Sequence, residues 1–512
     1  MAGPQHLDGA SLSTTALTIA ALILIPLIVV LKRLLFPVFD AREPPILRPK
    51  IPFFGHVFSL VREGANFNHR LYKEKKPPIC TLPMLHGKMY LVNSPALIAA
   101  AMRNGNISFY PFQSLASTAI IDLPQRHIEK LNHPEVFHQI GKTMAGTLMK
   151  ESLQAINAAS LGYCSEVLNA FGETPKTVPA WDWVQEVMAM AAGRALYGRN
   201  NMWDVKTFED LWIFDENLAI LGANFAPNLL APKAVAARHR MRALLRPFYA
   251  DHLDENPDVA SIVKGRANAL RGRGIPSDEL GFTEYLLPWA ATTNTIPMTF
   301  WFLLNVFSKP EYVERIRKEV SAITTMDKTA HGGHDATLYT SEMETACPFL
   351  TACYREVLRL YVAQVSNRRV MEDLTLDDAD GRQYLLKKDT NLQWATSVTH
   401  LMPEVWGDDV TTFRPERFLY ATAEEERRRR GFMLPFGGGK HLCPGRFFAQ
   451  TEITGFVAAM ALGFDVQDVK VPPAGVPALA AAARHPAKGQ GNFEIKISRR
   501  KDWENVNWRF VC

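Results

Sequence analysis

Cysteine is scarce in this chain. Six occur among 512 residues, at positions 80, 164, 347, 353, 443 and 512, and none forms a CxxC pair. This pattern argues against a zinc site built from paired cysteines. A chain of this length does not need disulfides to stabilise its fold, so we expect a protein of a reducing compartment.

A dominant charge of one sign is also lacking. Lys and Arg total 57 against 52 for Asp and Glu, which gives a net charge of +5. This balance lacks the strongly basic field of a nucleic-acid-binding protein, so no nucleic acid partner is expected. The arginine run at 427–430 directly follows the glutamates at 424–426. We interpret it as an exposed surface loop.

A long apolar run lies near the N-terminus. Residues 15–31 carry no charge, and Lys32 and Arg33 follow directly. A helix of this length, extended by a few apolar residues, crosses a bilayer core of about 30 Å. A signal peptide should carry its cations before the apolar run, whereas here they follow it. We therefore predict a short lumenal tail at 1–13 and a transmembrane anchor at 14–36, with the body on the cytoplasmic side.

Proline is dense after the predicted anchor, and we interpret residues 37–56 as a stiff linker. Residues 57–512 show no internal repeat and read as one large domain. Helical periodicity dominates there, so the expected fold is mainly α with small β-sheets. The predicted helical stretches are 133–171, 234–253, 286–307 and 310–323, the predicted β-type stretches are 79–92 and 492–500, and 324–344 is predicted as an exposed polar loop.

Glycine gathers before one cysteine in the stretch FGGGKHLCPG, residues 436–445. The glycines at 437–439 let the backbone turn and approach another group closely. A helix is predicted to begin near Arg446, and its N-terminal dipole should lower the pKa of the Cys443 thiol. A free cysteine is often only a small buried residue. Here a thiolate at a helix start, cupped by bare backbone, favours a nucleophile or a metal ligand.

Of these two roles, the glycines favour the metal ligand. A nucleophile needs a base, and His441 is only two residues away from Cys443. Bare backbone suits a large flat ligand, such as a haem whose iron binds a cysteine thiolate. The stretch resembles the cysteine-ligand loop of the cytochrome P-450 superfamily, since Phe436, Gly439, Cys443 and Gly445 match its pattern.

The resemblance implies a P-450 fold, with haem b between a long oxygen-side helix and the helix after the cysteine. It implies that Cys443 is the axial iron ligand and that Phe436 and Gly437 lie against the haem. The family commonly has an arginine two residues before the cysteine, in contact with a haem propionate. His441 takes that position here, and it carries charge only when protonated.

Three further residues match a charge network of the same family. Glu356 and Arg359 stand at i, i+3 in YREVLRLY, and Arg417 lies in FRPERF. At this spacing a surface ion pair is common and contributes little to stability. In the family these three residues form a buried network that holds the segment carrying the cysteine. A fourth match is Arg368, favoured over Arg369 as a haem propionate partner because of its spacing to Asp373.

The predicted helix at 286–307 resembles the oxygen-side helix of the family. The family usually places an acid followed by a threonine there, and this chain has Asn294 and Thr295. The amide can orient a water molecule but cannot deliver a proton itself. Pro297 lacks an N–H, so the Thr293 carbonyl should lose its helical partner and the helix should open. The stretch is similar to the branch of steroid 7-alpha-hydroxylase, steroid 12-alpha-hydroxylase and prostacyclin synthase.

The resemblance implies a monooxygenase that inserts one atom of dioxygen into a lipophilic substrate such as a terpenoid, sterol or polyketide. Electrons would come from NADPH through cytochrome P-450 reductase, with cytochrome b5 as a further possible donor. The sequence of the cysteine loop is similar to that of fungal members, many of which serve secondary metabolism. The predicted anchor implies the endoplasmic reticulum membrane. Because Asn294 replaces the acid, an isomerase or dehydratase acting on a peroxide without external electrons is the alternative. A haem sensor or an electron carrier is the non-enzymatic alternative.

Overall fold

The computed structural model describes residues 22–27, 39–49, 55–64, 66–84, 87–329, 333–477, 481–489 and 493–512. The predicted lumenal tail lies outside these residues, and so does the predicted anchor apart from residues 22–27, which are helical. Among the described residues, no helix is both long and apolar enough to cross a membrane. The anchor at 14–36 therefore stays a prediction.

Helices form most of the described chain, as the periodicity predicts. Those of seven or more residues are α2 (Val57–Glu63), α3 (Asn66–Lys75), α4 (Pro95–Arg103), α6 (Gln125–Leu131), α7 (Pro134–Thr147), α8 (Lys150–Asn169), α9 (Ala180–Tyr197), α10 (Val205–Glu216), α13 (Pro232–Ala250), α14 (Ser261–Arg271), α16 (Leu286–Thr292), α17 (Thr295–Phe307), α18 (Pro310–Ser321), α20 (Pro348–Tyr361), α24 (Ala423–Arg430) and α25 (Arg446–Gly463). Shorter ones are α5 (Tyr110–Leu115), α11 (Leu218–Ala223), α12 (Pro227–Leu230), α15 (Gly281–Glu284), α19 (Met343–Ala346), α21 (Thr396–Thr399), α22 (Pro403–Trp406) and α23 (Glu416–Leu419).

Four small sheets accompany these helices. The largest has the strand order β1-β2-β10-β7-β3, and the others are β11-β12-β4, β13-β6-β5 and β8-β9. The strands are β1 (Ile79–Pro83), β2 (Lys88–Val92), β3 (Ile107–Ser108), β4 (Lys176–Pro179), β5 (Thr324–Lys328), β6 (His334–Tyr339), β7 (Val365–Val370), β8 (Leu374–Asp377), β9 (Gln383–Leu386), β10 (Asn391–Ala395), β11 (Phe464–Gln467), β12 (Glu494–Arg499) and β13 (Val506–Val511). The predicted fold class is confirmed.

Two local predictions are wrong. The stretch 324–344, predicted as a loop, contains β5 and β6, and β6 pairs in parallel with the C-terminal strand β13. Ala336 and Leu338 alternate into the core there and fix the strand. The arginine run at 427–430 is exposed apart from Arg429, and it is helical, because Thr422 and Glu425 form a capping box at the start of α24.

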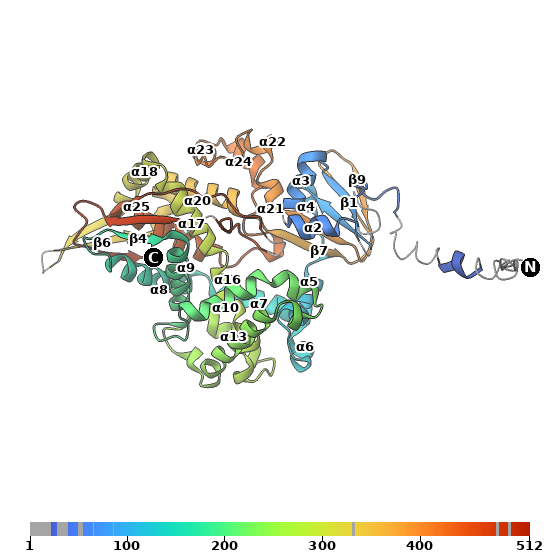
Figure 1. Ribbon diagram of the computed structural model, residues 1–512, viewed down its shortest axis with the longest axis horizontal. Coiled ribbons are helices and arrows are strands. Elements are labelled where there is room, and N and C mark those ends of the chain that lie inside the picture. The colour runs from blue at the N-terminus through green and yellow to red at the C-terminus, as the bar shows by residue number, and fades with distance from the viewer. Residues whose placement is uncertain are drawn as a thin grey trace, which may run out of the picture.

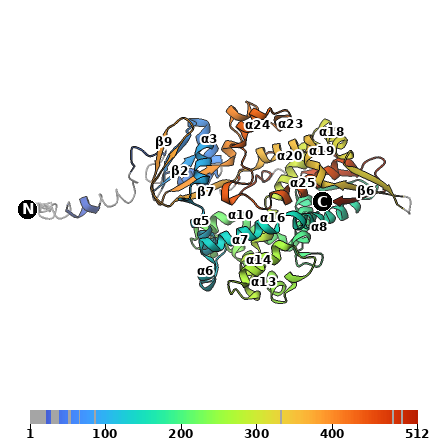
Figure 2. The same cartoon turned by 180° about the vertical axis from the view of Figure 1, so that it is seen from behind.

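The largest sheet and the helices α8 and α25 lie at different ends of the molecule. In both views the sheet containing β1, β2 and β7, together with α3, lies at one end, and α8 and α25 lie at the other (Figures 1 and 2). α17 runs through the interior, and all of its residues from Thr295 to Phe307 are buried. It is apolar on every face, as expected of a helix surrounded by protein. α9, α20 and α25 pack against it.

Part of the predicted linker packs on the body. Lys88 Nζ donates to Glu43 at 2.6 Å, and the Tyr90 hydroxyl donates to the same carboxylate at 2.6 Å. The backbone N–H of Leu47 donates to the carbonyl of Thr81 on β1 at 2.9 Å. The folded body therefore begins before residue 57, within the segment predicted as linker.

Candidate active site

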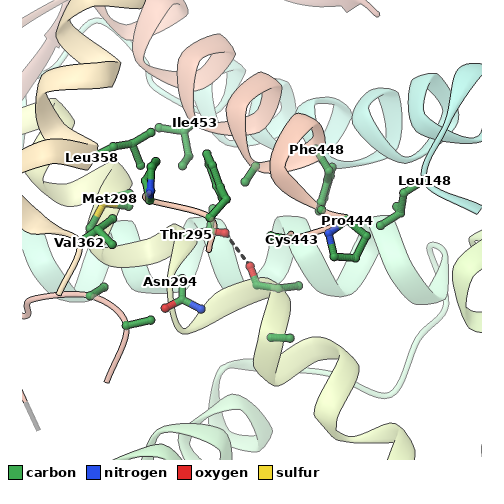
Figure 3. Close-up of a pocket in the computed structure, with 18 of the residues that line it drawn as sticks. Leu148, Asn294, Thr295, Met298, Leu358, Val362, Cys443, Pro444, Phe448 and Ile453 are labelled. Carbon is green, nitrogen blue, oxygen red and sulfur yellow. Dashed lines mark hydrogen bonds between the residues drawn. The ribbon is translucent and has the colours of Figure 1, made fainter. Parts of the chain in front are cut away.

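A cavity of about 300 Å³ lies between α17 and the segment that leads into α25. Asn294 and Thr295 line it from the stretch where α16 gives way to α17 (Figure 3). Cys443 and Pro444 line it from the segment before α25 (Figure 3). The fold therefore brings together residues that are almost 150 positions apart in the sequence, as the resemblance implies.

The backbone of the loop holds Cys443 in place. Its N–H donates to the carbonyl of Phe436 at 3.0 Å, which closes the loop, and α25 begins at Arg446. Burial raises the pKa of the Cys443 thiol, although the backbone N–H groups of Gly445 and Arg446 act to lower it. The prediction that the helix start lowers this pKa is wrong for the free thiol, because desolvation outweighs the N–H groups. A bound cation would restore the balance, since metal coordination deprotonates a thiol.

The glycines do not all face the cavity. A Cβ on Gly438 would lie 2.6 Å from Sδ of Met102 on α4, and one on Gly439 would lie 3.3 Å from the Met102 Cβ and carbonyl oxygen. Gly437 has a φ of +72° but does not line the cavity, whereas Phe436 and His441 do. Two of the three glycines therefore let the loop lie against α4, a reason that the sequence does not reveal.

We expect Gly439→Ala to destabilise the protein by about 1–3 kcal/mol more than Gly381→Ala. Both glycines have a positive φ, +61° and +81°, so the backbone strain of an alanine should be similar at the two positions. Around Gly381 there is open space, whereas the new methyl at 439 presses on Met102 and overpacks the contact by roughly 1–3 kcal/mol. Urea unfolding of the two variants measures the difference. Equal losses would show that backbone conformation alone requires glycine at 439.

The oxygen-side helix is interrupted where the proline predicts. α16 ends at Thr292 and α17 begins at Thr295, so Thr293 and Asn294 form a turn between them. The Thr295 hydroxyl donates to the carbonyl of Ala291 at 2.7 Å (Figure 3). Its lone pairs therefore remain available to accept a hydrogen bond from the cavity.

Arg368 is a buried cation in need of an anion. The strand β7 alternates, so Arg368 is 8% exposed while Arg369 turns away and donates to Asn391 at 3.0 Å. The guanidinium of Arg368 lies between the rings of Phe109 and Trp394, and no carboxylate in the described part of the chain contacts it. Burial lowers its pKa to about 10. Such a charge is costly to bury without an anionic partner.

His441 lies beside Arg368 at the edge of the cavity. Its ring packs against Phe109, with 5.2 Å between ring centroids, so His441 and Arg368 share one aromatic neighbour. Burial and the charge of Arg368 lower the pKa of His441, which keeps the imidazole neutral at pH 7. Asp373, whose spacing favoured Arg368 over Arg369 in the sequence, pairs with Lys387. A buried guanidinium and a hydrogen-bonding imidazole at one edge fit the carboxylates of a haem.

The predicted charge network is present and buried. Arg359 makes two hydrogen bonds of 2.7 Å to the carboxylate of Glu356, and Arg417 Nε donates to the same carboxylate at 3.3 Å. All three side chains have 0% exposure. The i, i+3 pair is therefore not the surface pair that its spacing alone would suggest.

His400 connects this network to the cysteine loop, a link that sequence reasoning missed. Arg359 donates to the carbonyl of His400 at 3.0 Å, and the His400 ring accepts from the N–H of Leu434 at 3.0 Å. Burial lowers the pKa of His400 to about 3, so Nε2 stays an acceptor. Leu434 stands two residues before Phe436, so the network anchors the start of the loop.

Comparisons with known proteins identify the family. The cytochrome P-450 family model matches residues 44–490. A cytochrome P-450 monooxygenase of Gibberella zeae is 33% identical over 488 residues, which cover 93% of this chain and 92% of the relative. The 5-beta-cholestane-3-alpha,7-alpha-diol 12-alpha-hydroxylase of Sus scrofa is 24% identical, with 84% and 88% covered. The retinoic-acid-bound cyanobacterial CYP120A1 superposes with a TM-score of 0.69 at 19% identity, covering 90% of this chain and 100% of that one.

This chain belongs to the cytochrome P-450 family. It is an oxidoreductase of the monooxygenase type that depends on haem iron. The predicted likeness to fungal members and to the sterol 12-alpha-hydroxylase branch is confirmed. The comparisons give no support to the peroxide isomerase alternative.

Proposed function

We propose that this protein is a membrane-associated haem-thiolate monooxygenase that oxidises a sterol- or terpenoid-like substrate with electrons from NADPH. The observation that carries the proposal is the cavity, where Cys443 lies opposite Asn294 and Thr295. The rest of the lining is mainly apolar. It includes Leu287 on α16, Met298 on α17 and residues of α20 and α25.

Different residues around the cavity would hold different parts of a haem. When bound, the haem supplies the iron at which dioxygen is cleaved, a reaction favoured by a thiolate ligand. Cys443 would give its sulfur to the iron, with N–H groups of the following turn supporting the thiolate. Arg368 and His441 would hold the propionates. Thr295 would accept a hydrogen bond from water on the oxygen side, and Asn294 would orient that water.

The apolar lining indicates the substrate class. A cavity without a buried charge on its oxygen side suits a rigid hydrocarbon scaffold better than an ionised substrate. The porcine relative acts on a cholestane diol by its name, which fits this class. Gln364 is the second amide in the lining beside Asn294, and it would hydrogen-bond to an oxygen already on the substrate.

The proposed partners follow from the reaction type. Each turnover needs two electrons, which NADPH–cytochrome P-450 reductase would deliver, with cytochrome b5 as a possible second donor. A lipophilic substrate partitions into membranes, so an enzyme at the endoplasmic reticulum surface would meet it there. The apolar segment at 15–31 supports that location.

We expect disruption of the gene to make a compound accumulate that is one oxygen atom lighter than the product it replaces. High-resolution mass spectrometry of lipophilic extracts measures this, with a strain complemented by the intact gene as control. Incubating the accumulated compound with the full chain, reductase, NADPH and ¹⁸O₂ should place one labelled atom in the product. The proposal would be contradicted if the accumulated compound and the lost product had equal masses, or if the full chain converted the compound without NADPH.

A further inference from the structure

A second cavity lies behind the interrupted helix. Its volume is about 80 Å³, several times the roughly 10–15 Å³ that one water molecule requires. Thr293, Ile296 and Pro297 line it, whereas Asn294 and Thr295 line the active-site cavity. One opened turn of the oxygen-side helix therefore separates the two cavities.

The opened turn offers a free acceptor to the second cavity. In a helix the Thr293 carbonyl would accept from the N–H four residues on, which Pro297 lacks. In the described part of the chain no other donor reaches that carbonyl. Because Thr293 and Pro297 both line the second cavity, water there can donate to the Thr293 carbonyl. Such a water molecule would bind at the residue next to Asn294 in the sequence.

An acid lies on the opposite wall. Asp215, near the end of α10, is half-buried in the second cavity, and its carboxylate accepts from Trp289 Nε1 at 2.8 Å. Trp289 is on α16, and its carbonyl accepts from the Thr293 hydroxyl at 2.9 Å. The carboxyl is therefore tied to the same turn that separates the cavities.

The position of this acid matters because the oxygen side has none. Monooxygenation consumes one dioxygen, two electrons and two protons, and yields one inserted oxygen atom and one water. Asn294 cannot release a proton. Resting on the proposed function, we infer that Asp215 supplies these protons, through water in the second cavity and past the opened turn at Thr293. After each transfer the carboxylate regains a proton from bulk water.

The groups around Asp215 suit this role. On its own helix the exposed Glu216 faces it, and Glu216 pairs with Lys488 at 3.2 Å at the rim. His485 also lines the cavity, and burial lowers its pKa, so it stays neutral. α9 contributes Trp181 and Gln185, α16 the Trp289 indole, and α17 no charge. Burial raises the pKa of Asp215 to about 6, which leaves a protonated fraction near neutral pH.

The test compares Asp215→Asn with Glu209→Gln, a charge change on the exposed face of the same helix. Asparagine keeps an oxygen for Trp289 but has no proton to give. We expect NADPH-driven oxidation of the compound that accumulates in the disrupted strain to fall about tenfold or more in Asp215→Asn only. Asp215→Glu should restore it in part. Oxidation driven by hydrogen peroxide, which brings its own two protons and two electrons, should stay within about twofold of Glu209→Gln.

The pH profile separates proton supply from a structural role. Asp215 loses its proton as pH rises through about 6, so the NADPH-driven rate should decline above that pH and Asp215→Asn should lack the decline. Infrared difference spectra of the substrate-free full chain should show a carboxyl band titrating near pH 6 that Asp215→Asn removes.

Three outcomes would overturn the inference. One is an unchanged NADPH-driven rate in Asp215→Asn, and another is an equal loss with peroxide, which would indicate a structural role. The third is the absence of the titrating carboxyl band, and this arm needs neither substrate nor NADPH. Failure of the intact chain itself to oxidise the accumulated compound with NADPH would instead contradict the proposed function.

Discussion

Cys443→Ser is expected to abolish monooxygenation and to change the absorption spectrum of the bound haem. The serine hydroxyl is smaller than the thiol and does not ionise near pH 7, so the thiolate ligand is lost. Removing an outer partner of a metal site costs about 10–100-fold in affinity or activity, and loss of the protein ligand itself should cost more. Turnover with NADPH and reductase, together with the haem spectrum, measures the effect.

The matched control for this change is Cys512→Ser. Cys512 is half-buried like Cys443 but lies at the far end of the chain, beyond β13. We expect that variant to keep the haem spectrum and turnover of the unaltered protein. A Cys443→Ser protein with unchanged spectrum and turnover would show that another group binds the iron, and would contradict the assignment of the cavity.

Local motifs predicted the elements of the site that depend on short spacing. The cysteine loop, the Glu356–Arg359 pair and the break before Pro297 each need only neighbours in the sequence. The alternation of a strand likewise predicts that only one of Arg368 and Arg369 faces inward, and in the structure Arg368 is the buried one. In these cases covalent geometry sets which side chains share a face. The burial of the Glu356–Arg359 pair is implied by the family resemblance and not by its spacing.

Contacts between distant segments were beyond such reasoning. The packing of Gly438 and Gly439 on Met102 joins segments more than 300 residues apart, and no periodicity signals it. The strand β6 pairs with its neighbour β5 and also with β13 at the C-terminus, and the second pairing has no local signal in the sequence. Asp215 likewise gains its importance only from the approach of α10 to the opened turn. The pKa of Cys443 was misjudged because the depth of burial is a tertiary property.

Glu356→Gln is expected to lower the free energy of unfolding by about 3–5 kcal/mol. The carboxylate accepts from Arg359, from Arg417 and from the backbone N–H of Arg414 at 3.0 Å. Glutamine has the same shape as glutamate but no charge, and an NH₂ donor replaces one of the two carboxylate oxygens. The guanidinium of Arg359, with 0% exposure, would then remain buried without its counter-ion, and Arg417 would keep only its pair with Asp409. Urea unfolding measures the loss.

The same substitution should also reduce haem content, because the network positions the loop. Arg359 holds the His400 carbonyl, and the His400 ring holds the N–H of Leu434 just before the loop that carries Cys443. The control is Glu426→Gln, which breaks the pair with Arg355 on the outer side of α20, where both side chains are about 40% exposed. Such an exposed pair contributes about 0–1 kcal/mol. If both variants lost similar stability, burial would not explain the strength of the Glu356 network. If both kept full haem content, the contacts through His400 would not position the loop.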